Sequence, residues 1–316
     1  MINLAGVVGL IAFYWVSNFP DPVQPSTLSY LLESEESDSL EPGPPPTENP
    51  ALHGLWNLGI PQFHAFDPTG PTETPTIVPT EAVENPAVIG FSVGGRPLEV
   101  YRFGEGQTGR LIVAGIHGGN EWNTIKLAHE LIDYVTEHPE IVPEDVTLYI
   151  LPNLNPDGEA RVHGVDGRVN DNGVDLNRNW PYRWVQDYDR ESCWHYRPTS
   201  AGDSAASEPE TSALIGFIES HPEIDALISY HAAALGIFAG GVPDYEPSIR
   251  LAKKMAKVST YQYPPKDIGC VYTGNFTDWA SSVQKIAAVD IELHNFRYTD
   301  FDENLKILSV FLKFKK

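Results

Sequence analysis

The sequence RLIVAGIHGGNEW at residues 110–122 is the most informative about the fold, because its pattern predicts a buried strand joined to a helix through a short turn. Residues 110–116 are nearly all apolar, as in a central strand that is covered on both faces. Residues 121–137 repeat apolar side chains at helical spacing and stop at a His-Pro pair. Between the two elements, a pair of glycines separates His117 from Glu121 and allows a sharp turn of the backbone. Both side chains are therefore expected to face one point.

The same alternation of strands and helices continues on both sides of this stretch. Further strands are predicted at residues 98–103, 146–151, 225–230 and 285–293. Further helices are predicted at residues 208–219, 245–259 and 302–314. This order indicates an α/β fold with a mixed, largely parallel central sheet flanked by helices. Ligands of such sheets bind at the carboxyl ends of the strands, so the residues that follow each strand are the candidates for function.

The composition excludes several classes of protein. Among 316 residues, 43 acidic side chains oppose 21 basic ones, and the net charge of -22 argues against binding to nucleic acid. Two cysteines are too few for a disulfide scaffold or a four-thiolate zinc site. In an exported protein Cys193 and Cys270 could pair, and two separate thiols are equally compatible with the sequence.

The N-terminal part of the chain differs in composition from the rest. Residues 4–16 form an unbroken apolar run, which is short for a membrane span of ~20 residues and suits the core of a signal peptide. We therefore interpret residues 1–19 as a signal peptide or a membrane anchor, with residues 2–19 as the tether in the second case. Residues 20–86 are acidic and rich in proline and threonine, which predicts a mostly disordered linker. We expect residues 87–316 to form the folded domain, and we expect the protein to act outside the cytoplasm as a monomer.

Two predicted strand ends carry metal-binding side chains. His117 and Glu121 follow the strand at 110–116, and His231 follows the strand at 225–230. Two histidines and a glutamate that leave one position open for water are the ligands of zinc in many hydrolases. Each histidine alone would more often be an ordinary side chain near a strand end.

Seven short strings in a fixed order strengthen this interpretation. They are GFSVGGRPLEVYRFG (90–104), GIHGGNEW (115–122), NPDG (155–158), GVDLNRNW (173–180), SYH (229–231), TGNFTDWA (273–280) and IEL (291–293). With these strings the sequence resembles the zinc carboxypeptidases of the M14 family from Gly90 to Lys316. Each string alone is weak, and the collinear set is specific.

The resemblance implies a zinc metallopeptidase that hydrolyses the C-terminal peptide bond of its substrate. One Zn²⁺ would be held by His117, Glu121 and His231 and would activate a water molecule. Glu292 matches the general base, which takes a proton from the water and passes it to the leaving amine. The spacing departs from the family's His-x-x-Glu, because three residues lie between His117 and Glu121. The Gly-Gly turn can absorb the extra residue.

The resemblance also implies how a peptide would be bound. Arg178, with Asn177, matches the clamp for the terminal carboxylate, because the planar guanidinium can donate two parallel hydrogen bonds. Arg168 matches the arginine that stabilises the developing oxyanion, with Arg161 as the alternative. Tyr272 resembles the mobile tyrosine that closes over the substrate.

Two positions bear on selectivity and support of the site. Thr277 precedes the Asp-Trp pair at 278–279, where an acidic residue would favour substrates that end in lysine or arginine, so we expect a neutral or apolar terminal residue. Among the remaining histidines, His294 is the candidate for supporting the metal site, because it lies two residues beyond Glu292.

Three functions are compatible with these motifs. The first is a carboxypeptidase that acts on the C-termini of peptides or proteins. The second is a carboxypeptidase for cell-wall peptides, whose diaminopimelate or D-residue carboxylates Arg178 could bind equally well. The third is a non-catalytic peptide-binding homologue, which would be expected to lack a zinc ligand or the base; His117, Glu121, His231 and Glu292 are all present.

Overall fold

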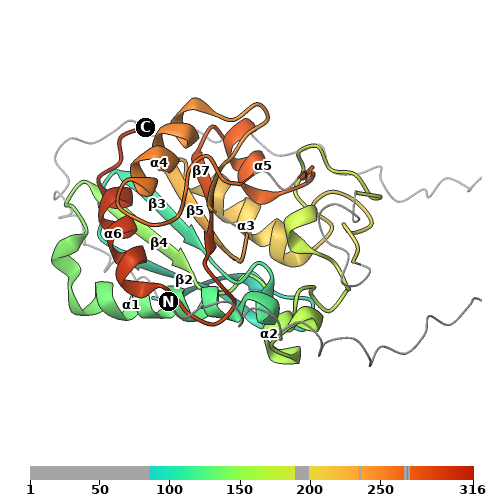
Figure 1. Cartoon of the computed structure of the whole chain (residues 1–316). Coiled ribbons are helices and arrows are strands. Elements are labelled where there is room, and N and C mark those ends of the chain that lie inside the picture. Colours follow the sequence, from blue (N-terminus) through green and yellow to red (C-terminus); the bar gives the residue numbers. More distant parts are fainter. Residues whose placement is uncertain (1–84, 189–198, 235, 267–268, 270) are drawn as a thin grey trace, which may run out of the picture. The chain divides into compact units, whose positions relative to one another are not determined.

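A computed structural model describes residues 85–188, 199–234, 236–266, 269 and 271–316. In this part of the chain, one sheet is covered by helices on both faces (Figure 1). Its seven strands are β1 (Ala87–Phe91), β2 (Pro97–Phe103), β3 (Thr108–Val113), β4 (Val146–Leu151), β5 (Ile224–Ala232), β6 (Gly236–Ala239) and β7 (Ala287–Leu293). The sheet confirms the predicted α/β fold.

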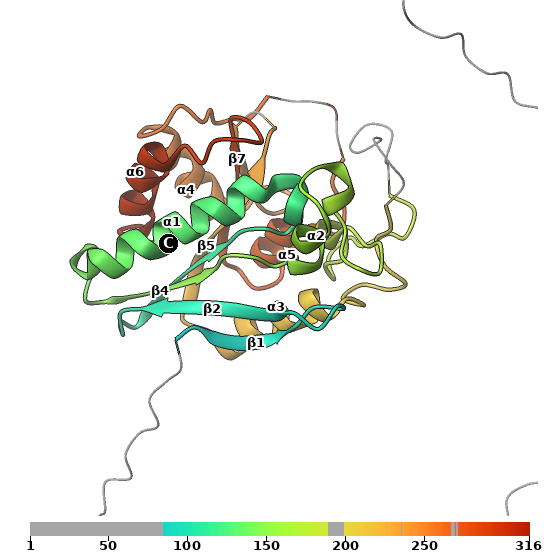
Figure 2. The same ribbon diagram turned by 90° about the horizontal axis from the view of Figure 1, so that it is seen from below.

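The strands are arranged in the order β1-β2-β4-β3-β5-β7-β6. The four central strands, β4, β3, β5 and β7, are parallel to one another. The outer strands β1, β2 and β6 run antiparallel to their neighbours. Figure 2 shows β1 and β2 together at one edge of the sheet. The carboxyl ends of the central strands therefore gather at one side of the domain, where the predicted site residues lie.

Helices of two groups cover the sheet. The α-helices are α1 (Trp122–Glu137), α2 (Pro156–Arg161), α3 (Pro209–Ser220), α4 (Glu246–Ala256), α5 (Phe276–Ser282) and α6 (Phe301–Leu312). Short 3₁₀ helices are η1 (Gly118–Glu121), η2 (Pro139–Ile141), η3 (Val165–Gly167) and η4 (Leu176–Arg178). Apolar side chains of α1, α4 and α6 form one core with one face of the sheet. Those of α3 and α5 form a second core on the other face.

The alternation of side chains along β5 and β7 puts the polar residues on the face that α5 covers. On β7, Val289, Ile291 and Leu293 are fully buried, whereas the side chains of Asp290 and Glu292 between them are partly exposed. The register of the two parallel strands sets His231 opposite Glu292. Successive side chains of a strand point to opposite faces, so both carboxylates and the imidazole lie on one face.

All five predicted strands and the four predicted longer helices are present, with ends that differ by a few residues. The largest difference at the site concerns His231, which lies inside β5 and not after it. Strands β1 and β6 and helices α2 and α5 were not predicted. These elements are short, and their formation depends on pairing with strands already in the sheet or on side-chain caps.

Three predictions concern residues outside the described part. The signal peptide or anchor at 1–19 and nearly all of the linker at 20–86 lie there, as do Cys193 and Cys270. Within the described residues, every helix is too short or too polar to cross a bilayer.

Candidate metal centre and catalytic site

The turn after β3 carries His117 and Glu121 at opposite ends of η1. Gly118 within it has a φ of 45°, and a Cβ there would lie 2.8 Å from the carbonyl oxygens of Asn155 and Gly167. A Cβ at Gly119 would overlap the carbonyl oxygen of Val162. Only glycine fits so close to neighbouring backbone, and this tight turn accommodates the extra residue between the histidine and the glutamate.

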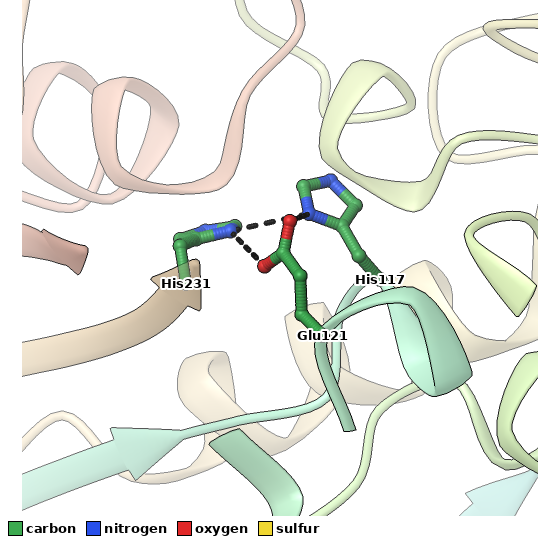
Figure 3. Close-up of side chains that lie close together, drawn as sticks. All are labelled: His117, Glu121 and His231. Atoms are coloured by element: carbon green, nitrogen blue, oxygen red, sulfur yellow. Dashed lines mark hydrogen bonds and ion pairs between the residues drawn. The ribbon is translucent and has the colours of Figure 1, made fainter. Parts of the chain in front are cut away.

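His117, Glu121 and His231 form a buried cluster (Figure 3). The two carboxylate oxygens of Glu121 lie between the imidazoles, with Oε1 2.8 Å from His117 Nδ1 and Oε2 3.2 Å from His231 Nδ1. The two Nδ1 atoms are 3.3 Å apart. One ligand atom from each residue can be chosen so that all lie within 4.8 Å of one another. The structure thus brings together the three residues predicted as metal ligands.

A second layer of polar groups contacts the outer nitrogens of both histidines. Asp175 Oδ1 lies 3.3 Å from His117 Nε2. On His231, Nε2 is 3.0 Å from Ser229 Oγ and 3.5 Å from Asp290 Oδ1. A carboxylate or hydroxyl on the outer nitrogen fixes the ring and makes its other nitrogen a better metal ligand. Both rings are therefore oriented with Nδ1 toward Glu121.

The cluster perturbs the pKa values of its members in the absence of a metal. Burial raises the pKa of Glu121, but the charges and hydrogen bonds of His117 and His231 outweigh burial and hold its pKa far below the ordinary value. Burial lowers the pKa of His231, but interactions with Asp290 and Glu121 outweigh it and hold this pKa well above the ordinary value. Without a metal, the cationic imidazole of His231 beside the Glu121 carboxylate is the electrostatic substitute for a bound cation.

The donor set fits zinc. Zn²⁺ in catalytic sites is bound by imidazole nitrogen and carboxylate oxygen, commonly from three protein groups. His117 and His231 supply two such nitrogens, Glu121 supplies the oxygen, and a polar atom lies within 3.3 Å of each outer nitrogen.

Glu292 lies beside this cluster on β7. Its Oε2 accepts a hydrogen bond of 2.9 Å from the backbone N–H of Ala234. Burial raises the pKa of Glu292 to about 7, partly opposed by the charge of His231 and reinforced by that of Glu121. A carboxylate whose pKa is near neutral can both accept and return a proton.

Arg178 is buried at the end of η4, next to Asn177. Its Nη1 donates to the backbone oxygen of Asn177 at 2.8 Å, and its guanidinium lies 5.2 Å from the ring centres of both Tyr188 and Tyr272. Its Nε has no hydrogen-bond partner, and no carboxylate of the described residues forms an ion pair with it. Burial, with the charge of Glu292, raises the pKa of Tyr272.

The two candidate arginines for the oxyanion differ in position. Arg168 is buried, donates from Nε to Asp175 Oδ2 at 2.9 Å and lies 3.5 Å from Glu121 Oε1 through Nη1. Arg161 instead donates to the backbone carbonyls of residues 166, 169 and 170 and to Asp171. Arg168 adjoins the metal cluster, whereas Arg161 holds the loop between α2 and η4.

The structure does not bring His294 to the cluster. β7 ends one residue earlier, and the half-exposed imidazole contacts Asp300 through Nδ1 at 2.8 Å and Thr260 through Nε2 at 2.9 Å. The expectation that His294 supports the metal site is wrong, because the chain turns outward after the strand.

Three side chains of the site were not singled out from the sequence: Asp175, Ser229 and Asp290. Asp175 belongs to the GVDLNRNW string, and this membership could have marked it as a candidate site residue. In the structure it also accepts a hydrogen bond from the N–H of Asn177. Ser229 and Asp290 lie two residues before His231 and Glu292. The period of two along a strand is the signal that would have found both.

A buried two-histidine, one-glutamate cluster at the strand ends of an α/β sheet defines a class of metal-binding proteins. Comparison of the sequence with models of known protein families identifies the family. The model of a family described as zinc carboxypeptidase (Peptidase_M14) matches residues 85–305, and the chain belongs to this family.

Curated relatives share limited identity with the chain. Zinc carboxypeptidase A 1 of Anopheles gambiae is 26% identical over 212 residues, which are 58% of this chain and 48% of that protein. The carboxypeptidase N catalytic chain of Homo sapiens is 33% identical over 156 residues, or 42% of this chain and 34% of that protein. The chain therefore matches about half or less of the length of these relatives.

Solved structures share the fold. Bovine thrombin-activatable fibrinolysis inhibitor in complex with tick carboxypeptidase inhibitor matches with a TM-score of 0.60 and 20% identity, over 72% of this chain and 88% of that chain. The murein-tripeptide amidase MpaA of Escherichia coli O157 matches with a TM-score of 0.51 and 22% identity, over 73% and 92%.

Proposed function

We propose that this protein is a zinc-dependent carboxypeptidase that removes the C-terminal residue of a peptide. The observation that carries the proposal is the buried guanidinium of Arg178, 3% exposed, which has no carboxylate partner among the described residues. A buried charge is costly unless it is paired, so such a group is suited to a ligand that brings its own carboxylate. The terminal carboxylate of a peptide is that ligand.

Substrate binding and chemistry would then be carried out by separate groups of the site. Arg178 and Asn177 bind the terminal residue through its carboxylate, and Tyr272 packs against the same guanidinium. Zinc held by His117, Glu121 and His231 would supply a polarising charge for the scissile carbonyl and a water of lowered pKa. This arrangement would hold the last peptide bond of the substrate at the metal.

Glu292 is the proposed general base. Because Oε2 is held by the N–H of Ala234, Oε1 takes the proton from water and passes it to the leaving amine. The pKa of about 7 suits this exchange. Arg168, which is buried beside Glu121, is the proposed donor to the developing oxyanion.

Paired peptides that end in a free carboxylate or in an amide test the proposal. We expect release of the terminal residue from the acid only, and loss of most activity in Glu292→Gln, which keeps the size of the side chain. Arg178→Leu should raise KM for the acid far more than it lowers the zinc content. Equal cleavage of acid and amide would show that Arg178 is not a carboxylate clamp.

We infer that the protein acts outside the cytoplasm, on the basis of the apolar run at residues 4–16. Mass spectrometry of the mature N-terminus, together with fractionation of the producing cells, tests this. A protein with an intact N-terminus in the soluble cytoplasmic fraction would contradict it.

A further inference from the structure

Basic side chains gather on α4, at the end of α6 and at the C-terminus of a chain that is otherwise acidic. Residues 247–266 and 304–316 hold nine basic side chains, and all 43 acidic side chains of the protein lie outside these two segments. The net charge of -22 therefore does not describe this part of the surface. We define the basic face by six exposed lysines of these segments and of the turn before β7: Lys253, Lys254, Lys285, Lys313, Lys315 and Lys316.

The local structure directs these lysines to solvent. Apolar side chains of α4 pack against the sheet, which leaves Lys253 and Lys254 on the outer side of the helix. Beyond the end of α6, Phe314 is 1% exposed, whereas Lys313 and Lys315 on either side of it are exposed. The buried ring thus anchors the C-terminal residues in the core, and the neighbouring ammonium groups stay in water.

Three contacts hold the segments of the basic face together. Lys254 Nζ lies 5.6 Å from the ring centre of Phe314, and Lys316 Nζ donates to the backbone oxygen of Lys285 at 2.7 Å. Arg110, near the start of β3, donates from Nη2 to the backbone oxygen of Phe314. Figure 1 shows the C-terminus beside α4 and α6, on the opposite side of the domain from α2. The basic face therefore lies at the amino ends of the central strands, whereas the metal centre lies at their carboxyl ends.

The described carboxylates do not neutralise the basic face. None of its six lysines forms an ion pair with an acidic side chain of the described residues, in contrast to Lys126, which pairs with Glu130 on α1 at 3.6 Å. The charge of Lys316 opposes the rise in the pKa of Asp225 that burial causes, but this carboxylate forms its ion pair with Arg110. The positive charges of the face are therefore available to a ligand.

The chemistry of helix ends accounts for only part of this arrangement. Lysines in the last turn of a helix interact favourably with its free carbonyl groups, which suits Lys253 and Lys254 on α4. Lys285, Lys315 and Lys316 lie outside the helices, so stabilisation of a helix end does not explain them. A negatively charged surface that contacts all three segments explains the whole set.

We propose that the basic face docks the domain on the phosphate headgroups of an anionic lipid bilayer. Clusters of about four to eight lysines bind such membranes, and each lysine near the surface strengthens binding by about fivefold. A bilayer meets the domain from one side only, so the acidic residues on the far side lie beyond the screening length of about 8 Å. A long, flexible polyanion would reach those residues and be repelled by them. The proposal does not depend on the carboxypeptidase function, and it leaves the metal centre open on the side away from the membrane.

Sedimentation with lipid vesicles tests the proposal on the full-length protein. Vesicles of phosphatidylcholine alone are compared with vesicles that also contain phosphatidylglycerol, each at low and at high salt. We expect the anionic lipid to raise binding by about tenfold or more, and high salt to remove that gain. An apolar anchor within residues 2–19 would bind both kinds of vesicle at either salt concentration, so the difference between the vesicles measures the basic face.

Two double variants locate the binding. Lys313→Gln/Lys315→Gln removes two charges from the basic face and should weaken binding to the anionic vesicles by about tenfold or more. Lys126→Gln/Arg297→Gln is the matched control, because it removes the same charge from exposed side chains of α1 and of the loop after β7, and it should leave binding unchanged. Without vesicles, Lys313→Gln/Lys315→Gln should cleave peptides like the wild type, so a failure of the proposed function would not affect this test.

The outcomes separate the bilayer from other partners. A loss of about tenfold that is confined to Lys313→Gln/Lys315→Gln supports the proposal. Equal binding to both kinds of vesicle, or equal weakening by both double variants, overturns it. Binding to duplex DNA or to polyglutamate without binding to the anionic vesicles assigns the basic face to a soluble polyanion and also overturns it.

Discussion

His117 is held by a carboxylate at each ring nitrogen. Glu121 lies 2.8 Å from Nδ1 and Asp175 lies 3.3 Å from Nε2. Asp175 is fully buried and also pairs with Arg168 at 2.9 Å, so its charge orients two groups of the site at once. The burial of Asp175 raises its pKa, but the charges of Arg168 and His117 outweigh burial and hold the pKa well below the ordinary value. It therefore stays ionised wherever the protein is folded near neutral pH.

Replacement of Asp175 by asparagine should weaken zinc binding by about 10- to 100-fold, because His117 loses its charged partner while the cap on Asn177 is kept. Competition with a chelating dye measures the affinity directly. Asp171→Asn is the control, since this half-exposed carboxylate pairs with Arg161 and Arg96 away from the cluster. Unchanged affinity in Asp175→Asn would contradict the orienting role.

Zinc binding should release protons at neutral pH. The pKa of His231 is raised well above its ordinary value without metal, so the ring is cationic at pH 7 and must lose a proton to bind a cation. The apparent zinc affinity should therefore rise with pH until the raised pKa is passed. Titration calorimetry in two buffers of different ionisation enthalpy counts the protons, and identical heats in both buffers would contradict this assignment.

Some residues of the site can be predicted from sequence patterns, and others cannot. The zinc ligands, Arg178 and Glu292 could be proposed because each belongs to a short local string. The hydrogen bond between Asp290 and Thr277 could not be predicted from the sequence, because it joins α5 to β7 and depends on how these two elements pack. Similarly, only the structure shows that Arg168 adjoins the metal cluster and that Arg161 does not, since their positions depend on which way the loop folds.

At the scale of elements, the strand–turn–helix around η1 could be predicted, because it combines an apolar run, two glycines and helical periodicity. The edge strands could not be predicted from the sequence. β6 has four residues, GIFA, and its place beside β7 is set by pairing with a strand some fifty residues later in the chain. Its contribution to the site is indirect, through Phe238 opposite Asp290.

The close packing of the η1 turn predicts that a larger residue is not tolerated at Gly119. Alanine there would overlap the carbonyl oxygen of Val162, so Gly119→Ala should lower the free energy of unfolding by about 3 kcal/mol and weaken zinc binding. In contrast, Gly216 lies inside α3 with open space around it, and Gly216→Ala should raise stability by roughly 0.5–1 kcal/mol. Urea denaturation of both variants tests the pair; a well-tolerated alanine at 119 would mean that the turn is not constrained by its neighbours.

For the whole molecule, charge and composition predict a division of the chain between residues 86 and 87. Residues 1–86 hold 11 of the 43 acidic side chains and no basic one. Asn85 nevertheless pairs with the backbone of Arg102, accepting from its N–H at 2.8 Å and donating to its oxygen at 3.0 Å. A fragment that begins at 85 keeps these two bonds, whereas the predicted boundary at 87 removes them.

The proposed reaction is the removal of single residues from free C-termini at a zinc site. The most direct measurement is mass spectrometry of a mixed set of peptides after incubation with the zinc-loaded protein, with Glu292→Gln in parallel. We expect a loss of single C-terminal residues with the wild type only, and no loss after chelation of the metal. Internal cuts, or equal trimming by Glu292→Gln, would contradict it.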